Sequence, residues 1–255
     1  MYPGDILSSR AKVHPGLYAV IPEAGLVHNV IPGISDCHSS ILASPKLGAG
    51  FVQYLVDAAP QKGRSTVAFA GEEGIEAFIY VISGEGLLVD IAGEEQRLAA
   101  GGYGYAPMGK GISFHNLSEA SIRFLLFKQR YRPLIGHEAR IVFGSAEAIP
   151  YREYADMQNV LIKDLLPNEL GFDLNFHILC FKPGGCHPFV ETHVQEHGAY
   201  VLGGEGMYYL GDNWLPLRQG DYVWMGAFCP QAAYGIGRED FYYVYSKDCN
   251  RDVEF

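Results

Sequence analysis

A motif that returns about halfway along the chain constrains the fold more than any other feature. The run Tyr-Val-Ile-Ser-Gly-Glu-Gly at residues 80–86 is matched by Tyr-Val-Leu-Gly-Gly-Glu-Gly at residues 200–206. A second spacing, Gly-x5-Pro-x-Gly from residue 101, is matched by Gly-x5-Gly-x-Phe from residue 220. A repeat of this length is a duplicated domain, because solenoid units are much shorter. The sequence therefore predicts two domains of one fold, at residues 1–140 and 141–255.

Short apolar stretches bounded by Gly or Pro occur in both halves, for example at residues 17–21, 50–56 and 241–246. Such stretches are typical of β-strands. The chain contains 31 Gly and 14 Pro, which supply the many turns that short strands need, and it has no long segment of helical periodicity. We therefore expect an all-β protein made of two tandem jelly-roll β-barrels with few short helices.

Charge and composition exclude several classes of partner. The net charge of −10 and the lack of any Lys/Arg run argue against nucleic-acid binding. No apolar run approaches the ~20 residues of a membrane span, and the N-terminus is too polar for a signal peptide. The 5 Cys residues are scattered without Cys-x-x-Cys spacing, so neither a disulfide framework nor a thiolate zinc site is expected. We expect a cytoplasmic protein, and aromatic-rich strands near the N-terminus suggest a homo-oligomer.

One carboxylate and two imidazoles lie within seven residues at Glu191, His193 and His197. On an extended strand, side chains at i, i+2 and i+6 point to the same face of the sheet. We therefore expect the three groups to converge, as the ligands of a divalent cation would. The alternative is that they are merely polar residues on an exposed face.

A second interpretation takes His193-Val-Gln-Glu196-His197 as the inverted zincin motif H-x-x-E-H. It requires a helix that presents both imidazoles to zinc, with the glutamate as base. Pro188 before the segment and Gly198 directly after it disfavour such a helix. Under the strand interpretation, Glu196 has the opposite parity to the ligands and is a bystander.

A third interpretation comes from the spacing of the whole segment, which resembles the two motifs of the cupin family. The first motif, G-x5-H-x-H-x3-E-x6-G, is matched in spacing from residue 185 to residue 204, with Glu191, His193 and His197 at the ligand places. The second motif begins at residue 220 and has Gln231 where its ligand His normally stands. The resemblance implies a site of two nitrogen and two oxygen donors, which favours a hard ion such as Mn²⁺, with Fe²⁺ or Zn²⁺ as alternatives.

The first copy of the repeat serves as an internal control. Gly71, Glu73 and Ala77 stand where the second copy has its first three ligands, and Ile112 stands in place of the glutamine. One donor out of four cannot hold a metal. We therefore expect a metal-less N-terminal barrel and a single site in the C-terminal barrel.

The resemblance extends to one family within the cupins. The run from residue 191 to 200, Gly-Asp-Asn-Trp-Leu-Pro at residues 211–216 and the C-terminal segment 245–254 are similar to bacterial (S)-ureidoglycine aminohydrolases. The likeness implies Mn²⁺-dependent hydrolysis of (S)-ureidoglycine to (S)-ureidoglycolate and ammonia in purine and allantoin breakdown. It also implies that Tyr208, Tyr243 and Lys247 contact this small anionic ureide, with Lys247 and Tyr243 catalytic. The alternative is another metal-dependent cupin enzyme, a dioxygenase, isomerase or decarboxylase.

Strand parity supports part of this assignment independently. Tyr243, Tyr245 and Lys247 alternate along one predicted strand, so we expect all three to point into the barrel. An unpaired ammonium on such an inward face is costly, which favours a functional role for the lysine. His187 has the parity of the ligands, but Pro188 is expected to interrupt the strand between them.

Overall fold

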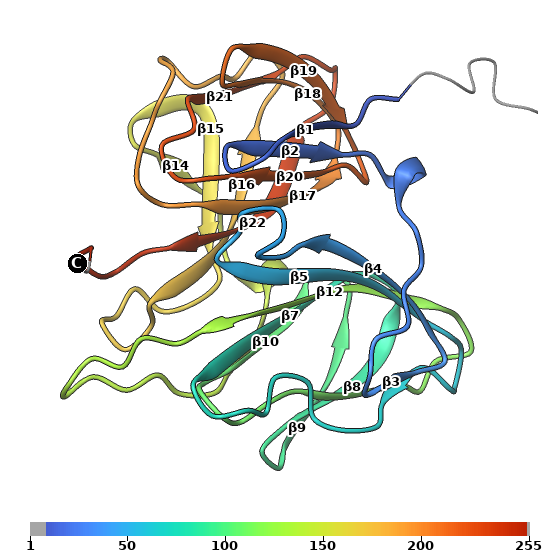
Figure 1. Cartoon of the computed structure of the whole chain (residues 1–255). Helices are drawn as coiled ribbons and strands as arrows, with labels where there is room; N and C mark the ends of the chain where they lie inside the picture. Colours follow the sequence, from blue (N-terminus) through green and yellow to red (C-terminus); the bar gives the residue numbers. More distant parts are fainter. Residues whose placement is uncertain (1–8, 254–255) are drawn as a thin grey trace, which may run out of the picture.

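The computed structural model describes residues 9–253, and their regular structure is almost entirely β-strand (Figure 1). Its helices in this range are two single 3-10 turns, η1 (Glu23–Gly25) and η2 (Ala146–Ala148). The prediction of an all-β chain with few short helices is confirmed. Neither turn has the length and apolar character that a membrane-spanning helix needs.

The N-terminal half is built from two antiparallel sheets that enclose an apolar core. The six-stranded sheet has the order β13 (Val142–Ser145), β10 (Gly102–Ala106), β7 (Ile75–Ser83), β12 (Ile122–Arg130), β5 (Phe51–Ala58), β4 (Cys37–Ala43). The five-stranded sheet has the order β3 (Ile34–Ser35), β6 (Arg64–Ser65), β11 (Ser113–Asn116), β8 (Glu85–Ile91), β9 (Glu94–Ala99). Alternating apolar side chains from both sheets fill the space between them, as the sequence pattern predicts.

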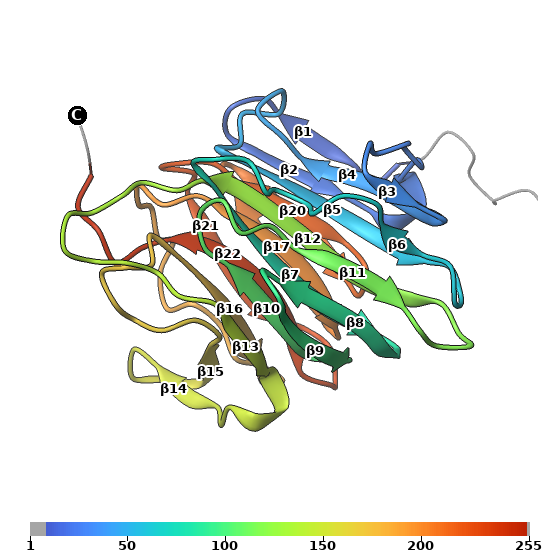
Figure 2. The same cartoon turned by 90° about the horizontal axis from the view of Figure 1, so that it is seen from below.

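The C-terminal half repeats this plan (Figure 2). Its eight-stranded sheet has the order β1 (Lys12–His14), β2 (Tyr18–Ile21), β20 (Tyr222–Met225), β17 (His197–Gly203), β22 (Phe241–Asp248), β16 (Leu174–Phe181), β15 (Met157–Asp164), β14 (Arg152–Tyr154). The opposing sheet has the order β19 (Asn213–Arg218), β18 (Glu205–Leu210), β21 (Gln231–Gly235). A second core, which is rich in tyrosine, lies between these two sheets.

Strand pairing divides the chain differently from the expected boundary between residues 140 and 141. Near the N-terminus, β2 pairs with β20 of the C-terminal half, and Figure 1 shows this blue segment beside the late strands. Conversely, β13 pairs with β10 of the N-terminal half. The pattern of residues 17–21 indicates a strand, but it does not reveal which distant edge that strand joins. By sheet membership, the C-terminal half therefore includes β1 and β2 from across the predicted boundary, and the N-terminal half includes β13.

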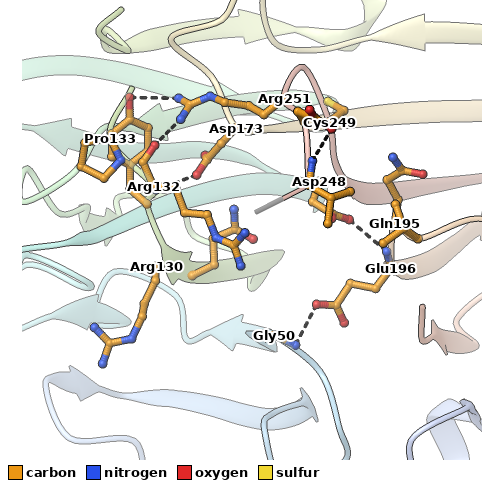
Figure 3. Close-up of a pocket in the computed structure, with 15 residues that line it drawn as sticks. Gly50, Arg130, Arg132, Pro133, Asp173, Gln195, Glu196, Asp248, Cys249 and Arg251 are labelled. Carbon is orange, nitrogen blue, oxygen red and sulfur yellow. Dashed lines mark hydrogen bonds between the residues drawn. The ribbon is translucent and has the colours of Figure 1, made fainter. Parts of the chain in front are cut away.

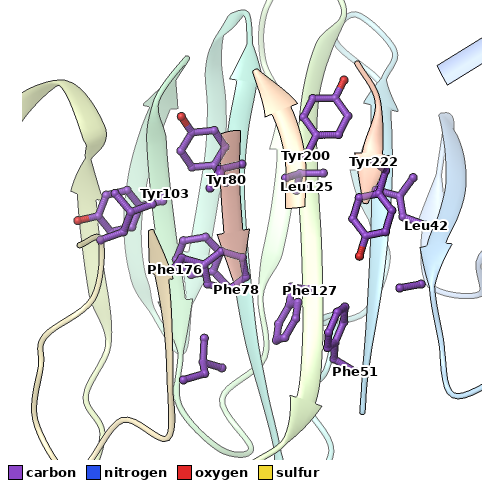
Figure 4. Close-up of a cluster of buried hydrophobic side chains, with 14 of the residues drawn as sticks. Leu42, Phe51, Phe78, Tyr80, Tyr103, Leu125, Phe127, Phe176, Tyr200 and Tyr222 are labelled. Carbon is purple, nitrogen blue, oxygen red and sulfur yellow. The ribbon is translucent and has the colours of Figure 1, made fainter. Parts of the chain in front are cut away.

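The two barrels meet face to face through a cluster of large buried side chains (Figure 4). Phe78 of β7 stacks on Phe176 of β16 with ring centroids 3.8 Å apart, and Phe127 of β12 meets the same ring edge-on. Tyr222 of β20 donates a hydrogen bond of 2.9 Å to Gln53 Oε1 of β5. Because strands from both halves supply this core, the N-terminal barrel directly supports β17, β20 and β22.

Candidate metal and substrate site

A small cavity of about 20 Å³ lies inside the C-terminal barrel, large enough for one ion or water. Tyr243, Tyr245 and Lys247 of β22 all face it, which confirms the parity prediction for that strand. Tyr208 of β18 also lines it. The remaining side chains of its wall are Tyr154, Leu179, His187, Glu191, His193, His197, Met225 and Gln231. All seven residues assigned to the site from the sequence therefore share one cavity.

The segment that carries the predicted ligands is not the extended strand that the sequence suggested. His197 is the first residue of β17, and Glu191 forms an isolated bridge with Gln231. The residues between them, including His193, are irregular. The prediction of a strand over residues 191–197 is wrong, because Val190, Thr192 and Val194 supply strand propensity without a neighbouring strand to pair with. The segment also forms no helix, so the zincin interpretation is excluded.

Backbone carbonyls fix the orientation of both imidazoles. His193 Nδ1 lies 3.0 Å from the Gln195 carbonyl oxygen, and His197 Nδ1 lies 3.0 Å from the Ser246 carbonyl oxygen. A carbonyl only accepts, so both Nδ1 atoms carry the proton and both Nε2 atoms carry a lone pair. The two Nε2 atoms are 3.3 Å apart. Two lone pairs repel at this distance, whereas two nitrogen ligands ~2.1 Å from one ion would be separated by about this much.

The Gln231 amide lies close to these nitrogens, whereas the Glu191 carboxylate lies farther away. Gln231 Nε2 lies 2.8 Å from His193 Nε2, so exchanging the amide nitrogen and oxygen brings Oε1 to the cavity centre. The Glu191 carboxylate lies beside His187, with Oε1 3.9 Å from Nδ1. Among residues 9–253, no three His, Cys, Asp or Glu side chains gather as closely as ligands of one ion would. As placed, only the two imidazole nitrogens lie at ligand separation, so this set could hold a divalent cation only if the amide and the carboxylate turned toward them.

Burial determines the protonation of these groups. It lowers the pKa of His193 and, more strongly, that of His197, and neighbouring positive charges such as Lys247 act in the same direction. Burial raises the pKa of Glu191, and the Lys247 charge opposes that shift. Neutral imidazoles are the form that binds metals, whereas the raised pKa of Glu191 favours a protonated carboxyl, which must lose its proton to act as a ligand.

Two tyrosine hydroxyls form the inner wall of the cavity. Tyr208 and Tyr243 are each 2% exposed, and their hydroxyl oxygens are 2.7 Å apart. Burial raises the pKa of both phenols, so they remain protonated and act as hydrogen-bond donors. With the Lys247 ammonium on the same wall, the cavity presents donors to a negatively charged ligand.

Two residues near the site have larger roles than the sequence indicated. His187 is 4% exposed and lines the cavity, and its Nδ1 accepts a hydrogen bond from Ala233 N. Glu196, expected to be a bystander, accepts hydrogen bonds from Gly50 N and from Trp224 Nε1. Their odd or even spacing from the ligands was used to predict which way these side chains point. Such spacing predicts side-chain direction only within a regular strand.

Two tandem antiparallel barrels, one with a polar cavity of clustered donors, define a bicupin. The crystal structure of protein Ylba from E. coli superposes with a TM-score of 0.89 at 45% identity and covers 100% of both chains. The oxalate decarboxylase of Lactobacillus farciminis superposes with a TM-score of 0.67 at 12% identity, over 94% of this chain and 88% of that one. At that identity, the second likeness shows the shared fold alone.

Sequence similarity identifies the family within this class. The (S)-ureidoglycine aminohydrolase of Escherichia coli (strain K12) is 48% identical over 254 residues, which are 99% of this chain and 96% of that protein. The (S)-ureidoglycine aminohydrolase of Arabidopsis thaliana is 30% identical over 97% of this chain and 81% of its own length. The chain belongs to the (S)-ureidoglycine aminohydrolase family. No protein-family model matches the chain.

Proposed function

We propose that this protein hydrolyses (S)-ureidoglycine to (S)-ureidoglycolate and ammonia in the breakdown of purines through allantoin, and that it depends on Mn²⁺. The similarity that carries the proposal is the 48% identity to the E. coli enzyme across 99% of the chain. The cavity supports it independently, because it combines oxygen and nitrogen donors for a cation with groups that suit an anion.

The metal would be held by His193 and His197 through Nε2, by Gln231 through Oε1, and by the Glu191 carboxylate. Two oxygen donors alongside two imidazoles suit Mn²⁺ better than a thiolate set would. When bound, the ion supplies a fixed positive charge that a chelating, negatively charged ligand can approach. The carbonyl groups of Gln195 and Ser246 keep each imidazole in the tautomer that this role requires.

The reaction exchanges a carbon–nitrogen bond for a carbon–oxygen bond. Water adds its oxygen to the α-carbon, and the amino group takes up a proton and leaves as ammonia. Lys247 would bind the substrate carboxylate, since its ammonium group lies on the inner face and forms an ion pair with a carboxylate. The Tyr243 hydroxyl, hydrogen-bonded to Tyr208, can hold or pass a proton at the reacting carbon.

An ammonia-release assay on freshly generated (S)-ureidoglycine tests the proposal. Protein stripped by a chelator should be inactive, and Mn²⁺ should restore turnover more fully than Zn²⁺ or Fe²⁺. A Glu191→Ala variant should bind Mn²⁺ weakly and lose at least ~100-fold in kcat/KM, because a direct ligand matters no less than its supporting groups. Full turnover in the stripped protein would remove the metal from the proposal. A lack of ammonia release with every metal would overturn the reaction itself.

A further inference from the structure

Glu196, which lies in the irregular segment between the two imidazole ligands, makes three hydrogen bonds to distant parts of the chain. The carboxylate of Glu196 accepts a hydrogen bond of 2.8 Å from Gly50 N, which Figure 3 shows. It also accepts one of 3.0 Å from Trp224 Nε1. Its backbone N donates to Asp248 Oδ1 at 2.9 Å. One residue thereby connects the segment to three others that are distant in sequence.

These contacts cross between the two barrels. Gly50 directly precedes β5 of the N-terminal six-stranded sheet, whereas Trp224 lies in β20 and Asp248 ends β22 of the C-terminal sheet. Tyr222, two residues before Trp224, also bonds to Gln53 of β5. The N-terminal barrel therefore contacts the segment of the C-terminal barrel that carries the predicted ligands. Its own corresponding positions hold the buried side chains Ala77 and Ile112.

The chemistry of this contact is specific to a carboxylate. Both Glu196 oxygens accept from N–H donors, and an amide in its place would turn a donor toward one of them. The room for a side chain at Gly50 is also restricted, since a Cβ added there would collide with Glu196 Oε1. A side chain at residue 50 would therefore displace the flexible end of Glu196 from its hydrogen bonds.

We infer that Glu196 is a positioning residue, which uses the N-terminal barrel to hold His193 and His197 at ligand separation. The inference rests on the proposed metal site. The C-terminal barrel itself holds both ends of this segment, since Phe228 N donates to the His193 carbonyl and His197 pairs with Met225 of β20. Between these ends, Glu196 bonds the segment to the N-terminal barrel through Gly50. Through this bond, the N-terminal barrel raises the metal affinity of the other barrel.

A double-mutant cycle on metal-stripped, full-length protein tests this. Gly50→Ala lies outside the cavity wall and alters no cavity side chain, so it should act only by displacing Glu196. Titration with Mn²⁺, followed by its electron paramagnetic resonance signal, should show affinity about 10- to 100-fold weaker in Gly50→Ala and in Glu196→Ala. The double variant should be no weaker than Glu196→Ala, because the colliding atom is then absent. Gly25→Ala, where an added Cβ meets nothing, is the control.

A second readout separates this inference from the metal proposal. In metal-free protein, hydrogen–deuterium exchange over residues 190–197 should be faster in Gly50→Ala than in wild type. Unchanged exchange would overturn the positioning role whether or not Mn²⁺ binds. Faster exchange with unchanged Mn²⁺ affinity would show that the contact between Glu196 and Gly50 does not affect metal binding. If wild type itself binds no Mn²⁺, the metal proposal fails, and exchange alone decides whether Glu196 positions the segment.

Discussion

The ammonium of Lys247 faces the same cavity as Glu191 and the two imidazoles. Lys247→Met keeps most of the apolar stem of the side chain and removes its charge. If the ammonium binds the substrate carboxylate, kcat/KM for (S)-ureidoglycine should fall by about 100-fold or more. The free energy of unfolding, measured in urea, should change by less than ~1 kcal/mol because the group is partly exposed. Lys46→Met at an exposed position is the control, and normal kcat/KM in Lys247→Met would exclude a role in the reaction.

The hydroxyl pair of Tyr208 and Tyr243 gives a second prediction. Tyr243→Phe leaves the buried Tyr208 hydroxyl without its partner at 2.7 Å. The free energy of unfolding in urea should fall by about 1–3 kcal/mol, and ammonia release should slow. The double variant Tyr208→Phe with Tyr243→Phe should recover part of that stability, since both polar groups are then gone. If the single variant were as stable as Tyr242→Phe on the opposite face, the hydrogen bond would contribute nothing.

At this scale, the residues that the sequence groups together line one cavity, but their orientation was not predicted. Motif spacing brought Gln231 into the same group as Glu191, although 40 positions separate them, and the two are bridge partners. The direction of the Glu191 carboxylate, beside His187, depends on contacts that no motif encodes. His187 itself was given little weight because Pro188 follows it, yet Ala233 fixes its ring from a neighbouring strand.

Among the elements, β17 lies in close contact with the N-terminal barrel next to the site. A Cβ on Gly198 would meet the Tyr222 hydroxyl at 2.5 Å and Phe51 Cζ at 2.7 Å. Gly198→Ala should therefore lower the free energy of unfolding by about 1–3 kcal/mol, because rigid aromatic side chains must shift. The measurement is urea unfolding, with Gly25→Ala as the neutral control. Equal stability of Gly198→Ala and Gly25→Ala would mean that the barrels can move apart at Gly198 without a loss in the free energy of unfolding.

The strands also show when side-chain alternation is a reliable guide. It predicted the inward face of β22 correctly, because β16 and β17 pair with that strand on both sides and keep it extended. It failed for residues 192–196, which no neighbouring strand pairs with. Local sequence sets the propensity for an extended conformation, but only a partner strand enforces it.

At the scale of the whole molecule, duplication predicted two barrels, but the pairing of the chain ends could not be foreseen. The glycines at turns are local features of the sequence, and their presence in both copies revealed the duplication. The pairing of β2 with β20 joins residues about 200 positions apart and follows from which sheet edge is free. The sequence also predicts a metal-less first copy, and Ala77 and Ile112, which stand at its ligand positions, are both 0% exposed in its core.

A buried carboxyl at the junction of the barrels makes the stability of the whole molecule depend on pH. Glu76 of β7 is 0% exposed, and it accepts hydrogen bonds from Tyr105 of β10 and Gln129 of β12. Burial, followed by the negative charge of Asp173 from the C-terminal half, raises its pKa well above the ordinary value. Glu76 is therefore protonated more readily in the folded than in the unfolded protein.

The sign of the effect follows from this difference. The stability contributed by protonated Glu76 is fully present below the unfolded pKa of about 4.3, and it is lost as pH rises through the higher folded pKa. Glu76→Gln is uncharged at every pH and should lose less stability between about pH 5 and about pH 9. Urea unfolding of both proteins across this range measures the difference. Parallel curves would mean that Glu76 is ionised throughout, and that its hydrogen bonds with Tyr105 and Gln129 stabilise the charge despite Asp173.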